Sequence, residues 1–257
     1  MKNPIEGYLG KGEGGKRSKV PAKLDRWQSI TGAILGLFIM GHMFFTSSIL
    51  FGKDAMYYET KIFEGSLFLD KPQPYIVSIA VAIIFTIFII HAGLAMRKFP
   101  YRWREYRILK THVTTINHTD TSLWIVQAIT GFMMFFLGSV HLYLMLTIPE
   151  KIGPYASADR IYSDKMFILY SILMVSVIVH AMVGLYRLSV KWGLPQSDNP
   201  RLIRQKAKKA MWIAIIFFNL LGYSALSVYW KIGYEHQDRY GERYHPQSKS
   251  IEKGVDI

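Results

Sequence analysis

Residues 75–96 of the chain read YIVSIAVAIIFTIFIIHAGLAM, an apolar stretch that contains no proline and no Asp, Glu, Lys or Arg. A helix needs about 20 apolar residues to cross the hydrocarbon core of a bilayer. Lipid also offers open backbone groups no hydrogen-bond partner, so a single span must be helical. The stretch therefore predicts a transmembrane helix, and its one ionisable side chain, His91, lies where ionisable groups are costly and usually functional.

Four further stretches are equally long and apolar, at residues 27–51, 122–148, 166–190 and 210–230. The chain is 51% hydrophobic, which is high for a soluble domain. We expect an all-α fold: a membrane domain of five spanning helices over residues 25–230, with tails at 1–24 and 231–257. The first tail lacks the short apolar run of a signal peptide.

The charges predict the orientation of these helices. The N-terminal segment and the second and fourth connections hold seven basic residues against three acidic, six against two, and seven against one. The other two connections and the C-terminal tail together carry a net charge of −1. Basic residues collect on the cytoplasmic side. We therefore expect a cytoplasmic N-terminus and a periplasmic C-terminus in a bacterial inner membrane, and no nucleic-acid partner despite the net charge of +13.

The chain has no cysteine, which excludes thiolate-ligated iron–sulfur clusters and covalently attached c-type haem. Four spans contain one histidine each. At about 1.5 Å of rise per residue, His91 and His180 lie about 9–10 Å from the inner boundary, and His42 and His141 about 22–25 Å from it. We call His91 and His180 the inner pair and His42 and His141 the outer pair.

Two histidines at one depth on facing helices are what bis-histidine haem ligation requires, because each imidazole approaches the iron from one face. Four such residues at two depths favour two b-type haems. One buried histidine alone is more often a hydrogen-bonded core residue, so a haem-free histidine-containing transporter stays open as an alternative. Such transporters usually carry carboxylates inside the membrane, and the central portions of these spans contain none.

Five segments resemble the dihaem cytochrome b subunit of quinol:fumarate reductases and related succinate:quinone oxidoreductases. They are PAKLDRWQSITG and GLFIMGHMFF before and around His42, HAGLAMRKFP from His91, LWIVQAITGFMMFFLGSVHLYLM around His141, and HAMVGLYRLSVKWG from His180. The resemblance spans most of residues 21–193 and is specific to the single-subunit, two-haem branch.

This resemblance implies a membrane anchor that oxidises menaquinol near the outer side and passes electrons through both haems. The implied partners are an iron–sulfur subunit on the cytoplasmic face and a flavoprotein with the dicarboxylate site, and the resemblance allows a dimer of heterotrimers. The same role in a menaquinone-linked succinate dehydrogenase is the alternative. A hydrogenase or formate dehydrogenase cytochrome b is expected to place its ligands differently.

The resemblance also assigns roles beyond the four ligands. Glu64 matches a carboxylate that accepts protons from the quinol, a role that suits an acid beside the outer surface. Arg160 matches a site for the propionates of the outer haem, since cations pair with carboxylates. The remaining expected contacts belong to the inner haem: Gln28, Ser29, Trp124, Lys191 and His118.

One position departs from the family. Some members carry a glutamate two residues before the fourth ligand, proposed to carry protons across the membrane, and this chain has Ile178 there while Tyr170 is retained. We expect proton transfer through this subunit to be absent or to use haem propionates and water.

Overall fold

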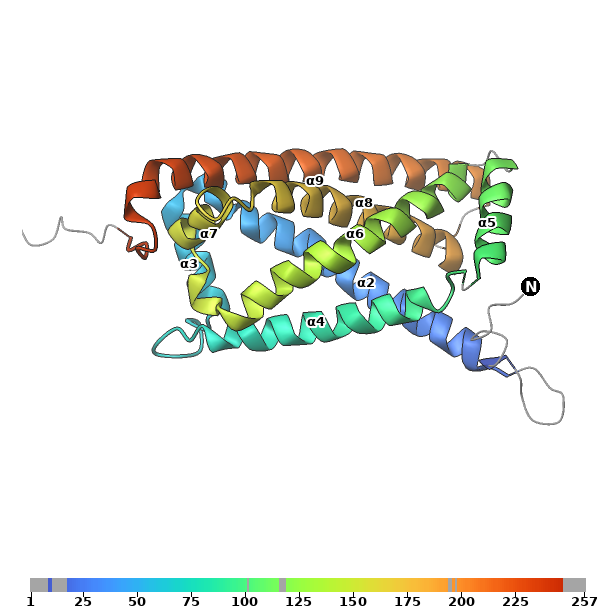
Figure 1. Cartoon of the computed structure of the whole chain (residues 1–257), viewed down its shortest axis with the longest axis horizontal. Helices are drawn as coiled ribbons and strands as arrows, with labels where there is room; N and C mark the ends of the chain where they lie inside the picture. The colour runs from blue at the N-terminus through green and yellow to red at the C-terminus, as the bar shows by residue number, and fades with distance from the viewer. Residues whose placement is uncertain are drawn as a thin grey trace, which may run out of the picture.

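The computed structural model describes residues 9–10, 18–100, 102–115, 119–193, 196 and 198–246. Five long helices run along the molecule and form a bundle in which α2 and α6 cross at a marked angle (Figure 1). The long helices are α2 (Val20–Thr46), α4 (Tyr75–Met96), α6 (Thr119–Thr147), α8 (Phe167–Trp192) and α9 (Pro200–His236).

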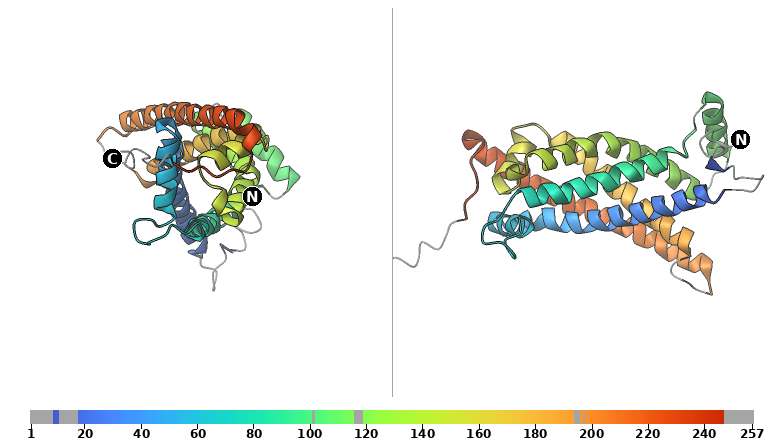
Figure 2. Two further views of the ribbon diagram at one scale, coloured as in Figure 1. Left: turned by 90° about the vertical axis from the view of Figure 1, so that its left-hand side faces the viewer. Right: turned by 90° about the horizontal axis from the view of Figure 1, so that it is seen from below.

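Shorter helices lie at the two ends of this bundle, as Figures 1 and 2 show. The end that holds α3 (Lys53–Phe63) and α7 (Pro154–Tyr162) is called the α3/α7 end, and the opposite end, which holds α5 (Trp103–Thr115), the α5 end. Three short 3-10 turns complete the described elements: η2 (Ser47–Phe51), η3 (Pro149–Lys151) and η4 (Gln237–Arg239).

The prediction of five membrane spans is confirmed. Each long helix is long and apolar enough to cross a bilayer. Large apolar side chains on these helices point outward, and Leu37, Phe136 and Leu220 are each about two-thirds exposed. Such a surface is costly in water but suits lipid chains, which are as apolar as the side chains themselves. The all-α expectation holds throughout the described residues.

The helices extend beyond the apolar runs that predicted them. The helix α9 begins at Pro200, where proline fits because the first helical residue needs no N–H partner, and the Asn199 side chain caps it by accepting from Leu202 N at 3.0 Å. Basic residues that the sequence analysis placed in a connection are therefore helical. The helices also reach into both expected tails, since α2 starts at Val20 and α9 ends at His236. Residues 1–8, 11–17 and 247–257 of those tails lie outside the described residues.

The helix α3 was not anticipated, because its mixture of polar and apolar residues is too short and too polar to read as a span. It follows Gly52, whose φ of 113° is accessible mainly to glycine. Met56 and Thr60 on one face of α3 are buried, so the helix packs with that face against the end of the bundle.

The buried side chains form two clusters. One joins α8 and α9 along the middle of the bundle and includes Ile178, Val183 and Phe218. The other lies at the α3/α7 end and joins η2, α7 and α9 through residues such as Ile49, Ala158 and Leu226. The second cluster anchors the short elements over the end of the bundle.

Gly233 of α9 lies at a close helix approach at this end. A Cβ atom at this position would lie 2.5 Å from the Ala158 carbonyl oxygen and 2.5 Å from Tyr162 Cβ, both in α7. Neither neighbour is the far end of a flexible side chain. The contact between α7 and α9 therefore requires a residue without a side chain, as close helix packing in membranes often does.

We expect Gly233→Ala to destabilise the protein by about 1–3 kcal/mol, the usual cost of overpacking. The thermal midpoint of the purified complex in detergent measures this, followed by size-exclusion chromatography. Gly93→Ala is the control, because nothing lies within 4 Å of a Cβ atom there. Equal midpoints for the two variants would contradict the assignment of a tight α7–α9 contact.

Candidate cofactor site

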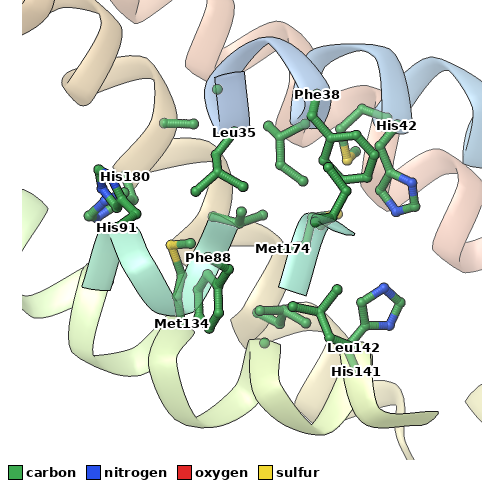
Figure 3. A pocket seen from close by; sticks show the side chains of 18 of the residues that line it. Leu35, Phe38, His42, Phe88, His91, Met134, His141, Leu142, Met174 and His180 are labelled. Atoms are coloured by element: carbon green, nitrogen blue, oxygen red, sulfur yellow. The ribbon is translucent and has the colours of Figure 1, made fainter. Parts of the chain in front are cut away.

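A cavity of about 1280 Å³ lies between α2, α4, α6 and α8, and all four intramembrane histidines line it. Pockets for single small molecules usually measure about 300–1,000 Å³. In Figure 3 the inner pair and the outer pair occupy two ends of this cavity, with Leu35, Phe88 and Met174 between them. The cavity therefore has two histidine ends and an apolar middle.

The structure brings together the pairs that the depth argument predicted. The ring centres of His42 and His141 are 6.1 Å apart, with 56° between the ring planes. Those of His91 and His180 are 6.5 Å apart, with 88° between the planes. Each pair joins two different helices, α2 with α6 and α4 with α8.

These separations fit two imidazoles on opposite sides of one metal ion. A metal–imidazole bond is about 2 Å and the ring centre lies roughly 1 Å behind the nitrogen, so the two centres are expected about 6 Å apart. The described residues hold no cluster of three or more histidine and carboxylate side chains able to bind a bare metal ion. Two ligands per level suit a metal that arrives with its own equatorial ligands, as haem iron does.

Hydrogen bonds orient three of the four rings through Nδ1. His180 Nδ1 lies 2.8 Å from the Gln127 carbonyl oxygen, and His91 Nδ1 lies 3.1 Å from Thr31 Oγ1. The Thr31 hydroxyl donates to the Trp27 carbonyl oxygen, so it accepts from His91. An Nδ1–H that donates leaves the lone pair on Nε2, which is how ligating histidines are usually held.

The outer pair is held by neighbouring rings. His141 Nδ1 lies 3.1 Å from the Tyr170 hydroxyl, which gives the retained Tyr170 a positioning contact. His42 stacks on Phe38 one helical turn earlier, with ring centres 5.5 Å apart and 18° between the planes. These contacts restrict ring rotation before any ligand binds.

Glycines on neighbouring helices make room for the inner pair. A Cβ atom at Gly32 would lie 2.9 Å from His91 Cε1, and one at Gly131 would lie 2.9 Å from His180 Cε1. Neither glycine was expected to contact a histidine from the sequence alone. Glycine in the segments QSITG and QAITG was the available signal, but only the fold shows which histidine each one faces.

The polar residues expected near the inner haem line the cavity at the α5 end. Lys191 Nζ lies 2.7 Å from Ser29 Oγ, which joins α8 to α2. Arg187, which the sequence analysis did not select, also lines the cavity and donates to Gln127 Oε1 at 2.5 Å. This end offers cations and hydrogen-bond donors to an anionic ligand group. The lining residues expected from the sequence are Gln28, Ser29, Trp124 and Lys191; His118 lies outside the described residues.

Arg160 is the corresponding cation near the outer pair. It lies in α7, lines the cavity and is buried. Its Nη2 donates to the Lys151 carbonyl oxygen at 2.6 Å, and the guanidinium also interacts electrostatically with the Tyr170 hydroxyl. A buried cation therefore lines the outer end of the cavity.

Glu64 is buried, with 2% of its surface exposed, and it lies directly after α3. Lys61 Nζ is 2.6 Å from its Oε2. Glu64 is not among the described residues that line the cavity, whereas Glu59 of α3 is. Burial raises the pKa of the Glu59 carboxyl. Glu59 was not expected from the sequence, because nothing in the sequence showed the helix that directs it inward.

Comparisons with known proteins show the family of the chain. The profile of the family described as succinate dehydrogenase/fumarate reductase transmembrane subunit matches residues 104–221. The chain is 47% identical over 234 residues to the fumarate reductase cytochrome b subunit of Wolinella succinogenes, covering 91% of each chain. It is equally similar to the subunits of that name from two strains of Helicobacter pylori, over 91% of this chain and 90% of theirs.

We expect Gly131→Ala to lower the haem content of the purified complex, because the added methyl group displaces the His180 ring from its bond to the Gln127 carbonyl oxygen. Pyridine haemochrome absorption per complex measures the change. Gly93→Ala, two residues after His91 and exposed, is the matched control. Unchanged haem content and spectrum in Gly131→Ala would show that this glycine does not set the position of the ring.

Proposed function

Since this chain belongs to the family of succinate dehydrogenase/fumarate reductase transmembrane subunits and is the cytochrome b membrane subunit of a fumarate reductase complex, we propose that it binds two b haems and oxidises menaquinol. The observation that carries the two-haem proposal is the pair of imidazole separations, 6.1 Å and 6.5 Å, at two levels of one cavity. The membership in a cytochrome b family argues against the haem-free transporter.

The residues of the chain suit each part of this role. The inner pair would hold one haem and the outer pair the other, and when bound the haems supply one-electron transfer between the two sides of the membrane. The chain itself orients the imidazoles through their Nδ1 atoms and encloses the site in apolar side chains. Lys191 and Arg187 line the cavity at the α5 end and would bind carboxylates such as propionates there. Arg160 lines it at the α3/α7 end and would do the same for the other haem.

We assign the α5 end to the cytoplasmic side, on the basis of the charge distribution. This end presents exposed basic side chains that an iron–sulfur subunit, with the flavoprotein beyond it, can contact. They are Lys98, Arg102, Arg104, Arg107 and Lys110. The quinol would then be oxidised near the opposite, α3/α7 end.

The proton released by the quinol needs an acceptor at that end. We propose Glu64 for this role on the basis of the family resemblance and its buried position beside Lys61. The helix α8 carries no carboxylate that could return protons across the membrane. Ile178 stands at the position where some family members have a glutamate, and it is buried with 1% of its surface exposed. The proposal therefore keeps proton release at the α3/α7 end and assigns no side-chain relay across the membrane.

The two-haem proposal predicts selective losses. His91→Ala or His180→Ala should remove the inner haem and halve the haem content, while His42→Ala or His141→Ala should remove the outer haem. Redox titration of the purified complex, followed by absorption, should show two transitions in the unmodified protein and one in each variant. A complex without haem, or one that titrates as a single haem before any substitution, would end the proposal.

Glu64→Gln should lower quinol oxidation by about 10²-fold or more, since a positioned general base contributes about 10²–10⁴-fold. Haem content and fumarate reduction with a viologen donor should stay normal, because neither uses this carboxylate. Steady-state assays with a water-soluble naphthoquinol and with reduced viologen measure the two rates. Normal quinol turnover in this variant would remove Glu64 from the mechanism.

A further inference from the structure

A second carboxylate, Glu59, faces the cavity at the α3/α7 end. Four residues of α3 line the cavity: Met56, Glu59, Thr60 and Phe63. Glu64, five residues further along, pairs with Lys61 and does not belong to the described lining. Of the two acids, Glu59 is the one that lines the cavity.

The wall beside Glu59 is suited to a flat apolar ring. Phe45 of α2 and Phe63 of α3 both line the cavity, and their rings meet edge to face with centres 4.8 Å apart. The two side chains are 47% and 44% exposed, so they remain accessible to a ligand. A ligand in this part of the cavity therefore has two aromatic rings to lie against, on the helices beside the carboxylate.

Polar groups next to Glu59 connect this wall to the outer pair. The Tyr229 hydroxyl lies 3.1 Å from the Thr46 carbonyl oxygen and interacts electrostatically with both Glu59 and Arg160. The Thr46 hydroxyl in turn donates to the His42 carbonyl oxygen at 3.0 Å. The acid, the phenol and the cation therefore lie at one end of the cavity, close to the helix segment that carries His42.

We propose that Glu59 is a proton acceptor for the quinol, whose ring would lie against Phe45 and Phe63 with one hydroxyl directed at the Glu59 carboxylate. This inference rests on the proposed function and adds a residue to it. Burial raises the pKa of the Glu59 carboxyl, so its carboxylate is a stronger base than that of a glutamate in water. A stronger base is better suited to take a proton at neutral pH.

The step balances in protons and electrons. Oxidation converts the two hydroxyls of the quinol into two carbonyls and removes two protons and two electrons. One O–H bond breaks as its proton binds a Glu59 oxygen, and the second proton goes to the acceptor already proposed, Glu64. The two electrons from the quinol, together with two protons taken up from the cytoplasmic side, convert fumarate to succinate at the partner subunits. Two protons leaving one ring give a physical reason for two acids at this end.

The test compares Glu59→Gln with Glu235→Gln in the purified complex. Glu235 is an exposed acid on α9, with 59% of its side chain exposed, and its variant should behave as the unmodified complex. Glu59→Gln should lower kcat for naphthoquinol oxidation at least tenfold, with haem spectra and viologen-driven fumarate reduction unchanged. Glu59→Asp, which keeps the carboxylate, should recover part of the rate.

The outcomes separate this inference from the proposed function. An unmodified complex that lacks haem or does not oxidise quinol defeats the proposed function. An unmodified complex that does so while Glu59→Gln retains full kcat defeats the assignment of Glu59 alone. Loss of haem or of viologen activity in Glu59→Gln, without rescue by Glu59→Asp, would also overturn it in favour of a structural role.

A measurement on the unmodified complex covers the case in which Glu59→Gln does not assemble. Dicyclohexylcarbodiimide reacts with protonated carboxyls in apolar surroundings, and peptide mass spectrometry locates the adduct. We expect an adduct at Glu59 that a bound naphthoquinone prevents. No adduct, or one that the quinone does not reduce, would overturn the assignment.

Discussion

The rest of the structure depends on keeping imidazole pairs at a fixed separation inside an apolar bundle. Each pair joins two helices that lipid alone would hold together only weakly. The spacing of 6.1–6.5 Å between ring centres suits a metal bound between the two imidazoles. The helices must therefore be positioned by other contacts, and the apolar cluster between α8 and α9 supplies many of these.

Three levels of organisation support the inner pair in particular. The helices bring His91 and His180 together, hydrogen bonds to Thr31 and Gln127 fix their ring orientation, and glycines on facing helices leave room for the rings. Removing any one of these leaves the histidines in the sequence but changes where their nitrogens lie. This dependence on supporting contacts is common in metal sites, where outer residues orient the ligands.

The α3/α7 end has a different character, because short helices and polar side chains cover it. Arg160, Tyr170 and Tyr229 gather there beside two acids of the first connection. A cation and two acids at the boundary between lipid and water can separate protons from electrons, since protons need a polar exit and electrons do not. The α5 end instead presents a basic surface, so the two ends are equipped for different partners.

The sequence by itself determined the five spans, the expected orientation and the pairing of histidines by depth. These follow from apolar length, charge distribution and helical rise, which are properties of each segment alone. Contacts between segments required the tertiary structure: α3 and its Glu59, the glycines that face His91 and His180, and the absence of Glu64 from the cavity wall. A helix of mixed polarity such as α3 is positioned by the surface it packs against, and which side chain then faces a cavity depends on that rotation rather than on residue spacing.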